Sequence, residues 1–365
     1  MGRTFPFSPS GAEGPDVAVD LGTANTLVYV RGRGIVVFEP SVVAIDERTG
    51  RVCAVGAEAK RMIGRTPAHI TATRPLADGR IREIDVAQQM LHQFLARAHH
   101  ARWGRPRVVV CIPSGLTGVE RAAVAEATYQ AGARAAALIE EPMAAAIGAG
   151  LPVAEPSASL MVDVGGGTSE MAVIALGGVV AGGSIRVGGD TLDEAIAGHI
   201  RRRYNFVVGA QSAEQLKLQV GCAWPGSVAS EAEAHGRHLA SGKASTVRLD
   251  PDEVLPVLEP ALAQICEAVS ATLEATPPEL SADLVNRGIT LAGGGALLPG
   301  LDRRLNATTG LPVSLAESPL TCVVMGAGHA LESLLAHPAA PGLRGRRRAG
   351  RSRKRVLPWH SAMIP

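Results

Sequence analysis

One pattern, present twice, constrains the fold of this 365-residue chain more than any other feature: an apolar strand, an Asp-x-Gly turn and a second apolar strand. The first copy spans residues 17–30 and contains Asp20-Leu21-Gly22-Thr23-Ala24-Asn25-Thr26; the second spans 160–174 and contains Asp163-Val164-Gly165-Gly166-Gly167-Thr168. Each copy leads into a further glycine turn, at 31–34 and at 177–178. This repeat predicts a chain built from two similar halves.

Each half continues with strands that alternate with helices. In the first half we expect strands at 107–112 and 135–139 and helices at 117–131 and 142–149. The second half has the same order, with strands at 288–292 and 311–314 and helices at 298–308 and 319–335. The alternation predicts an α/β fold of two similar mixed-sheet domains, each with helices on both faces.

Two variable stretches, about 33–80 and about 185–248, are interpreted as smaller subdomains inserted into these domains. The predicted organisation, in chain order, is a flexible N-terminal arm over 1–16, domain I over 17–157, domain II over 158–317, a helix at about 318–336 that completes domain I, and a basic disordered tail over 341–365.

Composition excludes several classes of protein. With 46% hydrophobic residues the chain can bury a core, which excludes a disordered protein. The five cysteines are odd in number and include no CxxC pair, so neither a zinc site nor a disulfide framework is expected, and a reducing cytoplasm fits. No apolar run approaches the roughly 18 to 20 residues that span a bilayer. Of the 36 Lys and Arg residues, eight lie in 341–365, which has no acid; the preceding 340 residues have 28 basic and 34 acidic residues, a net charge of −6.

The two Asp-x-Gly turns are candidate phosphate-binding sites. Ligands of such folds bind beyond the carboxyl ends of the strands, where these turns fall. A turn with little side-chain bulk also exposes its backbone N–H groups to a phosphate. Either turn alone could be an ordinary β-hairpin turn, in which Asp-Gly and Gly-Gly are common. Two turns with the same Asp-x-Gly spacing, each after an apolar strand that is expected to be buried, predict a site that holds a polyphosphate from both sides.

Asp20 and Asp163 lie at the mouths of these turns. Carboxylate oxygens suit a hydrated Mg²⁺ held through its water ligands, and without a cation they would repel a phosphate. The alternative is that each carboxylate caps its own turn.

Two further segments have weaker signals for a nucleotide. Gly293-Gly294-Gly295, followed by Ala296, connects a strand to a helix, where glycine also serves close packing. The segment from Ser212 to Lys217 has the pattern of a capped helix start, which would present Glu214 to ribose hydroxyls and Lys217 to the base or phosphates. A solvated helix face is the default interpretation of that pattern.

Glu140-Glu141-Pro142 follows the strand at 135–139 and so lies at the carboxyl edge of the first sheet. A carboxylate at this edge would orient a water that attacks a γ-phosphate. The alternative is a helix N-terminus stabilised by acids in its first turn and by proline.

Seven short segments, taken together in their order along the chain, carry a resemblance to a known family. They are 20–26, 39–45 (EPSVVAI), 138–150 (LIEEPMAAAIGAG), 163–170 (DVGGGTSE), 186–190 (RVGGD), 276–280 (TPPEL) and 291–298 (LAGGGALL). Together they resemble the MreB family of bacterial actin homologues. The match runs from about residue 17 to about residue 335 without a large gap, so it is much more specific than any single turn.

The resemblance implies an actin-like ATPase fold of four subdomains with ATP and Mg²⁺ as ligands. It also implies phosphoryl transfer to water, in which positioning and charge stabilisation supply most of the catalysis. The implied roles are phosphate binding by Thr23, Ala24, Asn25, Gly165, Gly166 and Gly167; nucleoside binding by Glu214, Gln215, Leu216, Lys217, Gly293, Gly294, Gly295 and Ala296; metal binding through water by Asp20 and Asp163; and positioning of the attacking water by Glu141 and Thr168.

The family resemblance further implies filaments of identical subunits beneath the cell membrane, which guide cell-wall synthesis and cell shape with membrane proteins of the elongation machinery. Such proteins often reach the membrane through an amphipathic N-terminal helix or an apolar loop near what is here 98–107. Residues 1–16 contain three prolines and no apolar stripe, and the loop offers chiefly Trp103. We therefore expect the tail at 341–365 to contact anionic lipid, or else to remain solvated, with nucleic acid a lesser alternative.

Two other classes share this ATPase core. A heat-shock chaperone would need a substrate-binding domain after the ATPase, where we expect only the short tail. A sugar kinase would need a general base for a substrate hydroxyl, and no distinct candidate is present beyond Glu141. We expect a cytoplasmic filament protein, with a non-polymerising regulatory paralogue as the main alternative.

Overall fold

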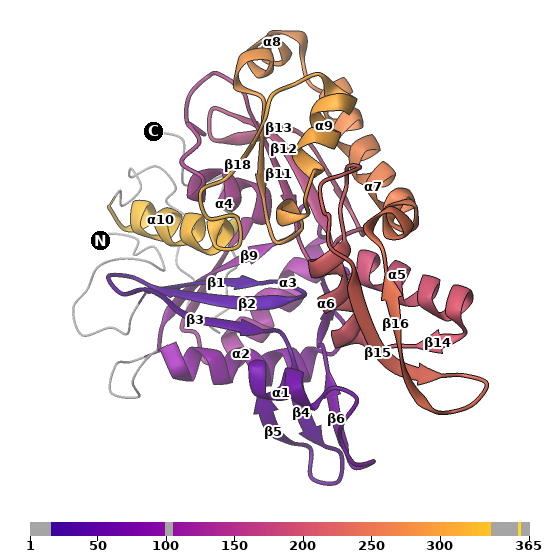
Figure 1. Ribbon diagram of the computed structural model, residues 1–365. Helices are drawn as coiled ribbons and strands as arrows, with labels where there is room; N and C mark the ends of the chain where they lie inside the picture. Colours follow the sequence, from indigo (N-terminus) through magenta and orange to yellow (C-terminus); the bar gives the residue numbers. More distant parts are fainter. Residues whose placement is uncertain (1–15, 99–104, 337–356, 359–365) are drawn as a thin grey trace.

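The computed structural model describes residues 16–98, 105–336 and 357–358. Two large sheets form the centre of the molecule, with helices packed on both faces (Figure 1). The six-stranded sheet has the order β19-β10-β9-β1-β2-β3, and the five-stranded sheet has the order β13-β12-β11-β17-β18. In both, an antiparallel hairpin is continued by parallel strands, which confirms the predicted duplication.

The six-stranded sheet and its helices form what we call the first half. Its strands are β1 (Asp16–Leu21), β2 (Asn25–Val30), β3 (Gly34–Pro40), β9 (Arg107–Ile112), β10 (Ala135–Glu140) and β19 (Leu357–Pro358). Its helices are α2 (Ile84–Ala98), α3 (Gly118–Gln130), α4 (Glu141–Gly148) and α10 (Cys322–Ala336). Strands β1 and β9 are buried along almost their whole length, as expected for central strands covered on both faces.

The five-stranded sheet and its helices form the second half. Its strands are β11 (Ser159–Val164), β12 (Ser169–Ala175), β13 (Gly178–Ile185), β17 (Ile289–Ala292) and β18 (Val313–Leu315). Its helical segments are α7 (Pro251–Glu274), α8 (Pro278–Arg287), the 3₁₀ turn η1 (Gly295–Leu297) and α9 (Leu301–Thr309). Every residue of β11 and β12 is buried.

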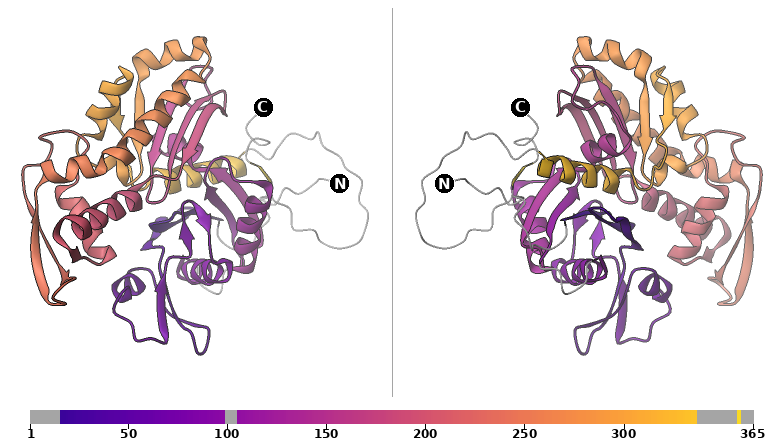
Figure 2. Two further views of the ribbon diagram at one scale, coloured as in Figure 1. Left: turned by 90° about the vertical axis from the view of Figure 1, so that its right-hand side faces the viewer. Right: turned by 90° about the vertical axis from the view of Figure 1, so that its left-hand side faces the viewer.

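Each half has a smaller sheet inserted into it, and Figure 2 shows both insertions projecting from the large sheets. The insertion of the first half contains β4 (Val43–Asp46), β5 (Arg51–Val55), α1 (Ala57–Met62) and β6 (Ile70–Thr73), followed by the short pair β7 (Leu76–Ala77) and β8 (Arg80–Ile81). The insertion of the second half contains α5 (Gly189–Tyr204), β14 (Phe206–Val207), α6 (Ala210–Val220), β15 (Ala232–His238) and β16 (Ala244–Leu249).

Helices α4 and α10 pack directly against each other between the two halves. Their backbones approach so closely that glycine is required at the crossing. A Cβ at Gly326 would collide with the carbonyl oxygen of Ala144, and one at Gly148 with that of Cys322. These two helices of the first half are therefore joined by a close backbone contact, and the apolar cluster around them includes Met161 and Ile174 of the second half, so it packs the two halves together.

Three sequence predictions need correction. Asp16, assigned to the N-terminal arm, belongs to β1, because its buried carboxylate pairs with Arg107 and its backbone pairs with β9. Residues 357–358, assigned to a disordered tail, form β19, because β10 would otherwise leave an edge of unpaired backbone groups. The helix start proposed at Ser212 lies inside α6, which begins after Gly209 with no side-chain cap; a glycine cap costs only a few tenths of a kcal/mol relative to serine.

Helix α7 is long and apolar enough, by length and composition, to cross a membrane. Its sequence contains no uninterrupted apolar run of that length, because acids and prolines interrupt it. Its apolar face, which includes Val254, Leu258, Leu262, Ile265 and Val269, is buried in the core of the second half. In this structure α7 is thus a core helix. The predicted N-terminal arm apart from Asp16, the loop residues 99–104, and the basic tail apart from 357–358 lie outside the described residues.

Candidate functional site

The two Asp-x-Gly turns face each other between the halves. The first connects β1 to β2 and the second connects β11 to β12, where the N–H of Gly165 donates to the carbonyl of Thr168 at 2.8 Å. A Cβ at Gly166 would lie 2.7 Å from the Cβ of Ala24, and one at Gly167 would lie 2.7 Å from Thr23 Oγ1. The absence of side chains at Gly166 and Gly167 therefore allows the turns to approach.

The third glycine segment lies beside the second turn. Strand β17 runs parallel to β11, with Asp163 opposite Ala292, so the chain leaves β17 at the same sheet edge. Gly293 has a φ of +81°, and a Cβ there would collide with the Asp163 carboxylate and the Val164 carbonyl. The segment from Gly293 to Ala296 thus lies directly against the second turn.

Four carboxylates converge where the turns meet. Burial raises the pKa of Asp20 to about 7, and burial together with the charges of Asp20 and Glu170 raises the pKa of Asp163 to about 8. The pKa of Glu141 is raised well above its usual value by burial and then by Glu170, Asp20 and Asp163. Burial also raises the pKa of Glu170. Such mutual repulsion in a buried site favours a cation.

The oxygen donors at this site suit a hydrated cation. Within residues 16–98, 105–336 and 357–358, no group of three or more His, Cys, Asp or Glu side chains is close enough to bind a metal ion together. Asp20 and Asp163 come from different halves and belong to the same set of converging carboxylates. These oxygen donors fit Mg²⁺, which usually keeps several of its waters.

The structure separates the roles of Glu140 and Glu141. Glu140, the last residue of β10, accepts a hydrogen bond from Arg121 Nη2 at 2.6 Å. Glu141 begins α4 and belongs to the carboxylate group, since Glu170, Asp20 and Asp163 all raise its pKa. Glu140 also lines the cavity that contains Thr168, so Glu141 is assigned to the carboxylate group by its electrostatic interaction with Glu170, Asp20 and Asp163.

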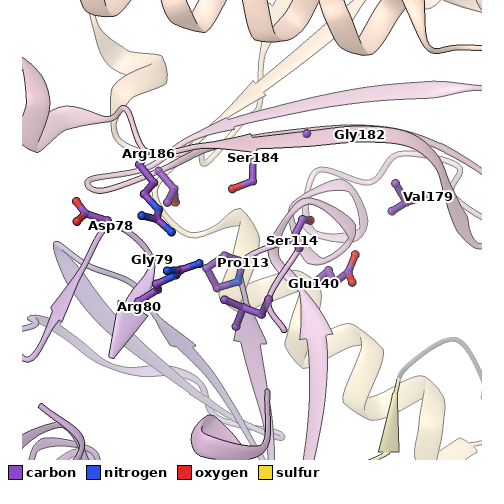
Figure 3. A pocket seen from close by; sticks show the side chains of 14 residues that line it. Asp78, Gly79, Arg80, Pro113, Ser114, Glu140, Val179, Gly182, Ser184 and Arg186 are labelled. Atoms are coloured by element: carbon purple, nitrogen blue, oxygen red, sulfur yellow. The ribbon is translucent and has the colours of Figure 1, made fainter. Parts of the chain in front are cut away.

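A cavity of about 370 Å³ begins at Thr168 and extends between the two halves. Figure 3 shows that the guanidinium groups of Arg80 and Arg186 point into it, with Ser114 and Ser184 close by. Glu170 lies at this junction with 1% of its surface exposed, and accepts hydrogen bonds from the backbone N–H of Ser114 at 2.9 Å and from Ser184 Oγ. Glu170 therefore connects the second half to the β9–α3 loop of the first.

The predicted nucleoside residues of α6 are engaged by other protein groups. Lys60 Nζ, on α1, lies 2.7 Å from Glu214 Oε2 and 2.9 Å from Oε1, so this ion pair crosses from one insertion to the other. Lys217 Nζ lies 3.0 Å from Asp193 and donates to the carbonyl of Gly189 at 2.9 Å. Gln215 is exposed, whereas the side chain of Leu216 packs in the core. The structure thus brings Glu214 to the opening between the insertions and turns Leu216 away from it.

Comparison with known proteins agrees with this arrangement. The family described as MreB/Mbl protein matches residues 14–338. The chain belongs to the MreB/Mbl family. It is 52% identical over 328 residues to the cell shape-determining protein MreB of Escherichia coli strain K12, covering 88% of this chain and 94% of that protein. It is 43% identical over 320 residues to the cell shape-determining protein Mbl of Bacillus subtilis strain 168, covering 87% and 96%.

Two solved structures have the same fold. MreB 5 of Spiroplasma citri bound to AMPPNP matches with a TM-score of 0.82 and 35% identity over 87% of this chain and 95% of that chain. MamK, solved as a double helical filament, matches with a TM-score of 0.74 at 24% identity. The actin-like fold predicted for this MreB-family chain is therefore confirmed.

Sequence reasoning missed four residues of this MreB-family site. They are Lys60, Arg74, Glu170 and Asp190, which contact partners on the opposite half. Weak signals existed for three of them. Lys60 is one of four lysines in the chain, and Glu170 and Asp190 end two of the seven quoted segments. Arg74 had no signal, because its partner lies 116 residues away.

Proposed function

We propose that this chain binds ATP with Mg²⁺ between the turns at 20–26 and 163–168 and hydrolyses the ATP slowly. The observation that supports this most strongly is the pair of opposed glycine-containing turns, one from each half, surrounded by four carboxylates with raised pKa values, of which Asp163 and Glu170 are buried. Backbone N–H groups on both sides suit an anion, while the carboxylates suit a cation. MgATP has both charges.

The proposed contacts follow the position of each segment. Backbone groups of Thr23, Ala24 and Asn25 and of Gly165, Gly166 and Gly167 hold the phosphates, while the nucleoside lies between Gly293–Ala296 and the α6 residues Glu214–Lys217. Because Lys60 occupies both oxygens of Glu214 here, a ribose hydroxyl has to share or displace that ammonium.

Hydrolysis depends on positioning of the attacking water. Asp20 and Asp163 would hold Mg²⁺ through its water ligands, and the bound ion would supply positive charge to neutralise the phosphates. Glu141 and Thr168 orient the attacking water. Glu141 would be ionised more readily beside a bound cation, so that its carboxylate could accept a hydrogen bond from that water.

We further propose that the nucleotide-bound chain assembles into filaments of identical subunits at the inner face of the cell membrane and there organises cell-wall synthesis with membrane proteins of the elongation machinery. Family membership and the names of the MreB and Mbl relatives as cell shape-determining proteins support this. MamK, which has the same fold, is itself solved as a filament.

Electron microscopy of the purified protein tests the proposal. The protein is incubated with ATP and Mg²⁺, with ADP, or without nucleotide, each on and off anionic lipid. Double protofilaments that depend on ATP are expected. The matched control is Gly166→Val, which should form none because its side chain collides with Ala24. Nucleotide binding without any filament would assign the chain to the non-polymerising regulatory alternative, and no nucleotide binding would refute the site.

A further inference from the structure

An ion pair connects the two halves close to the phosphate turns. Arg74 Nη1 donates to Asp190 Oδ1 at 2.7 Å, and the two side chains are 29% and 30% exposed. Arg74 follows β6 of the first insertion, and Asp190 lies in the first turn of α5. The pair therefore links elements that must separate whenever the two insertions move apart.

Asp190 is fixed to the second turn through the backbone. The N–H of Asp190 donates to the carbonyl of Gly166 at 2.8 Å, and the N–H of Gly189 donates to the carbonyl of Gly165 at 3.0 Å. A Cβ at Gly188 would lie 2.6 Å from the carbonyl oxygen of Gly166, so the turn and the start of α5 are closely packed. A displacement of the turn consequently displaces Asp190.

The segment that follows Arg74 contacts both turns. The N–H of Gly79 donates to Thr23 Oγ1 of the first turn at 3.3 Å. A Cβ at Gly79 would lie 2.8 Å from Thr168 Cγ2, and the N–H of Asp78 lies close to Gly167 of the second turn. Arg74 thus begins a short segment that spans the junction of the turns, with the ion pair to Asp190 at its start.

We propose that Arg74 is a positioning residue that holds the first insertion against the second half when the phosphate turns are occupied, and so retains the bound nucleotide. This inference rests on the proposed function, because it assumes a nucleoside triphosphate between the turns. The turn carries Asp190, Asp190 orients Arg74, and Arg74 keeps the segment 74–79 over the phosphates. Partial exposure to water keeps the pair weak enough to break for release.

A double-mutant cycle tests the inference. Arg74→Gln, Asp190→Asn and the double variant are prepared, and the dissociation rate of a fluorescent ATP analogue is measured with Mg²⁺ by displacement with excess ATP. Each single substitution is expected to raise the dissociation rate roughly 3- to 10-fold, since breaking a cross-interface charge pair acts mainly on dissociation. The double variant should be no faster than the faster single variant, because both remove one interaction.

Two controls separate this role from a general structural one. Arg287→Gln removes the 3.3 Å pair with Glu155, which lies within the second half and away from the segment 74–79, and should leave the dissociation rate unchanged. Arg74→Lys keeps the charge and should restore part of the retention. Circular dichroism establishes folding of every variant beforehand.

A distance measurement reports the motion directly. One spin label is attached to the exposed native Cys53 on β5, and the other to Ser241→Cys, an exposed position between β15 and β16. In the nucleotide-bound state, Arg74→Gln should lengthen and broaden the distance distribution relative to the parent, whereas Arg287→Gln should not.

The outcomes are distinguishable. If the parent does not bind the analogue, the proposed function fails and this inference fails with it. If the parent binds and the Arg74 and Asp190 variants release nucleotide at the parent rate, or if their effects multiply in the double variant, the inference alone is wrong.

Discussion

Asp163 should make the stability of the ligand-free protein depend on pH. Its side chain is 5% exposed, and burial, followed by the charges of Asp20 and Glu170, raises its pKa from 3.8 to about 8. Between about pH 4 and pH 8 the folded chain keeps this proton while the unfolded chain releases it. Because the folded state then binds more protons than the unfolded state, the free energy of unfolding falls as the pH rises through this window.

The substitution Asp163→Asn isolates this contribution, since an amide resembles the protonated carboxyl and does not titrate. One proton of difference corresponds to about 1.4 kcal/mol per pH unit. With an unfolding entropy of roughly 2.1 cal/mol/K per residue, a chain of this length converts that energy into about 2 °C of thermal midpoint. Between pH 5 and pH 7.5 the parent should therefore lose about 2 °C per pH unit relative to Asp163→Asn.

Scanning calorimetry at constant ionic strength, with a chelator and without nucleotide, measures both midpoints across this range. Asp46→Asn is the matched control. The pKa of Asp46 is lowered to about 2, mainly by its hydrogen bonds from Arg48, so it titrates below the window and its removal should leave the slope unchanged. Equal slopes for the parent and Asp163→Asn would refute the reasoning that Asp163 is protonated in the folded, ligand-free chain.

Three further predictions concern function. Gly166→Val should weaken MgATP binding by roughly 10-fold or more in isothermal titration, because its side chain forces the turns apart. Asp163→Ala should also weaken MgATP binding, because it removes a carboxylate that supports the metal ion. Parent-like titration of either variant would contradict the assignment of the site. Glu141→Ala should lower the rate of single-turnover hydrolysis by roughly 10²-fold with ATP affinity nearly unchanged. Glu140→Ala, which loses a contact with Arg121, should lower the rate less. A larger loss of rate in Glu140→Ala would assign the positioning of the attacking water to Glu140. Truncation after Ala340 should abolish sedimentation of the protein with anionic liposomes. The removed tail has eight Lys and Arg side chains, each of which contributes about 1 kcal/mol near such a surface and is screened by salt over about 8 Å. Unchanged binding by the truncated chain would exclude the tail as the membrane anchor.

Local sequence patterns were sufficient for much of the fold. The strand β9 was predicted with its observed bounds, and the two hairpins and their turns were placed correctly, because alternation of apolar runs and glycine turns is a property of neighbouring residues. Element ends were less certain. Helix α6 begins two residues before Ser212, since a glycine cap leaves no side-chain signal to read.

The sequence by itself determined that the chain has two similar halves, where each glycine turn lies, and which family the chain resembles, because these follow from short segments and their order. Only the tertiary structure decided that Glu140 pairs with Arg121 while Glu141 interacts with Asp20 and Asp163, and that Glu214 pairs with Lys60 and Asp190 with Arg74. The physical reason is that an ion pair depends on distance in space. Arg74 and Asp190 are 116 residues apart along the chain, and the folding of both halves around the turns brings them within 2.7 Å.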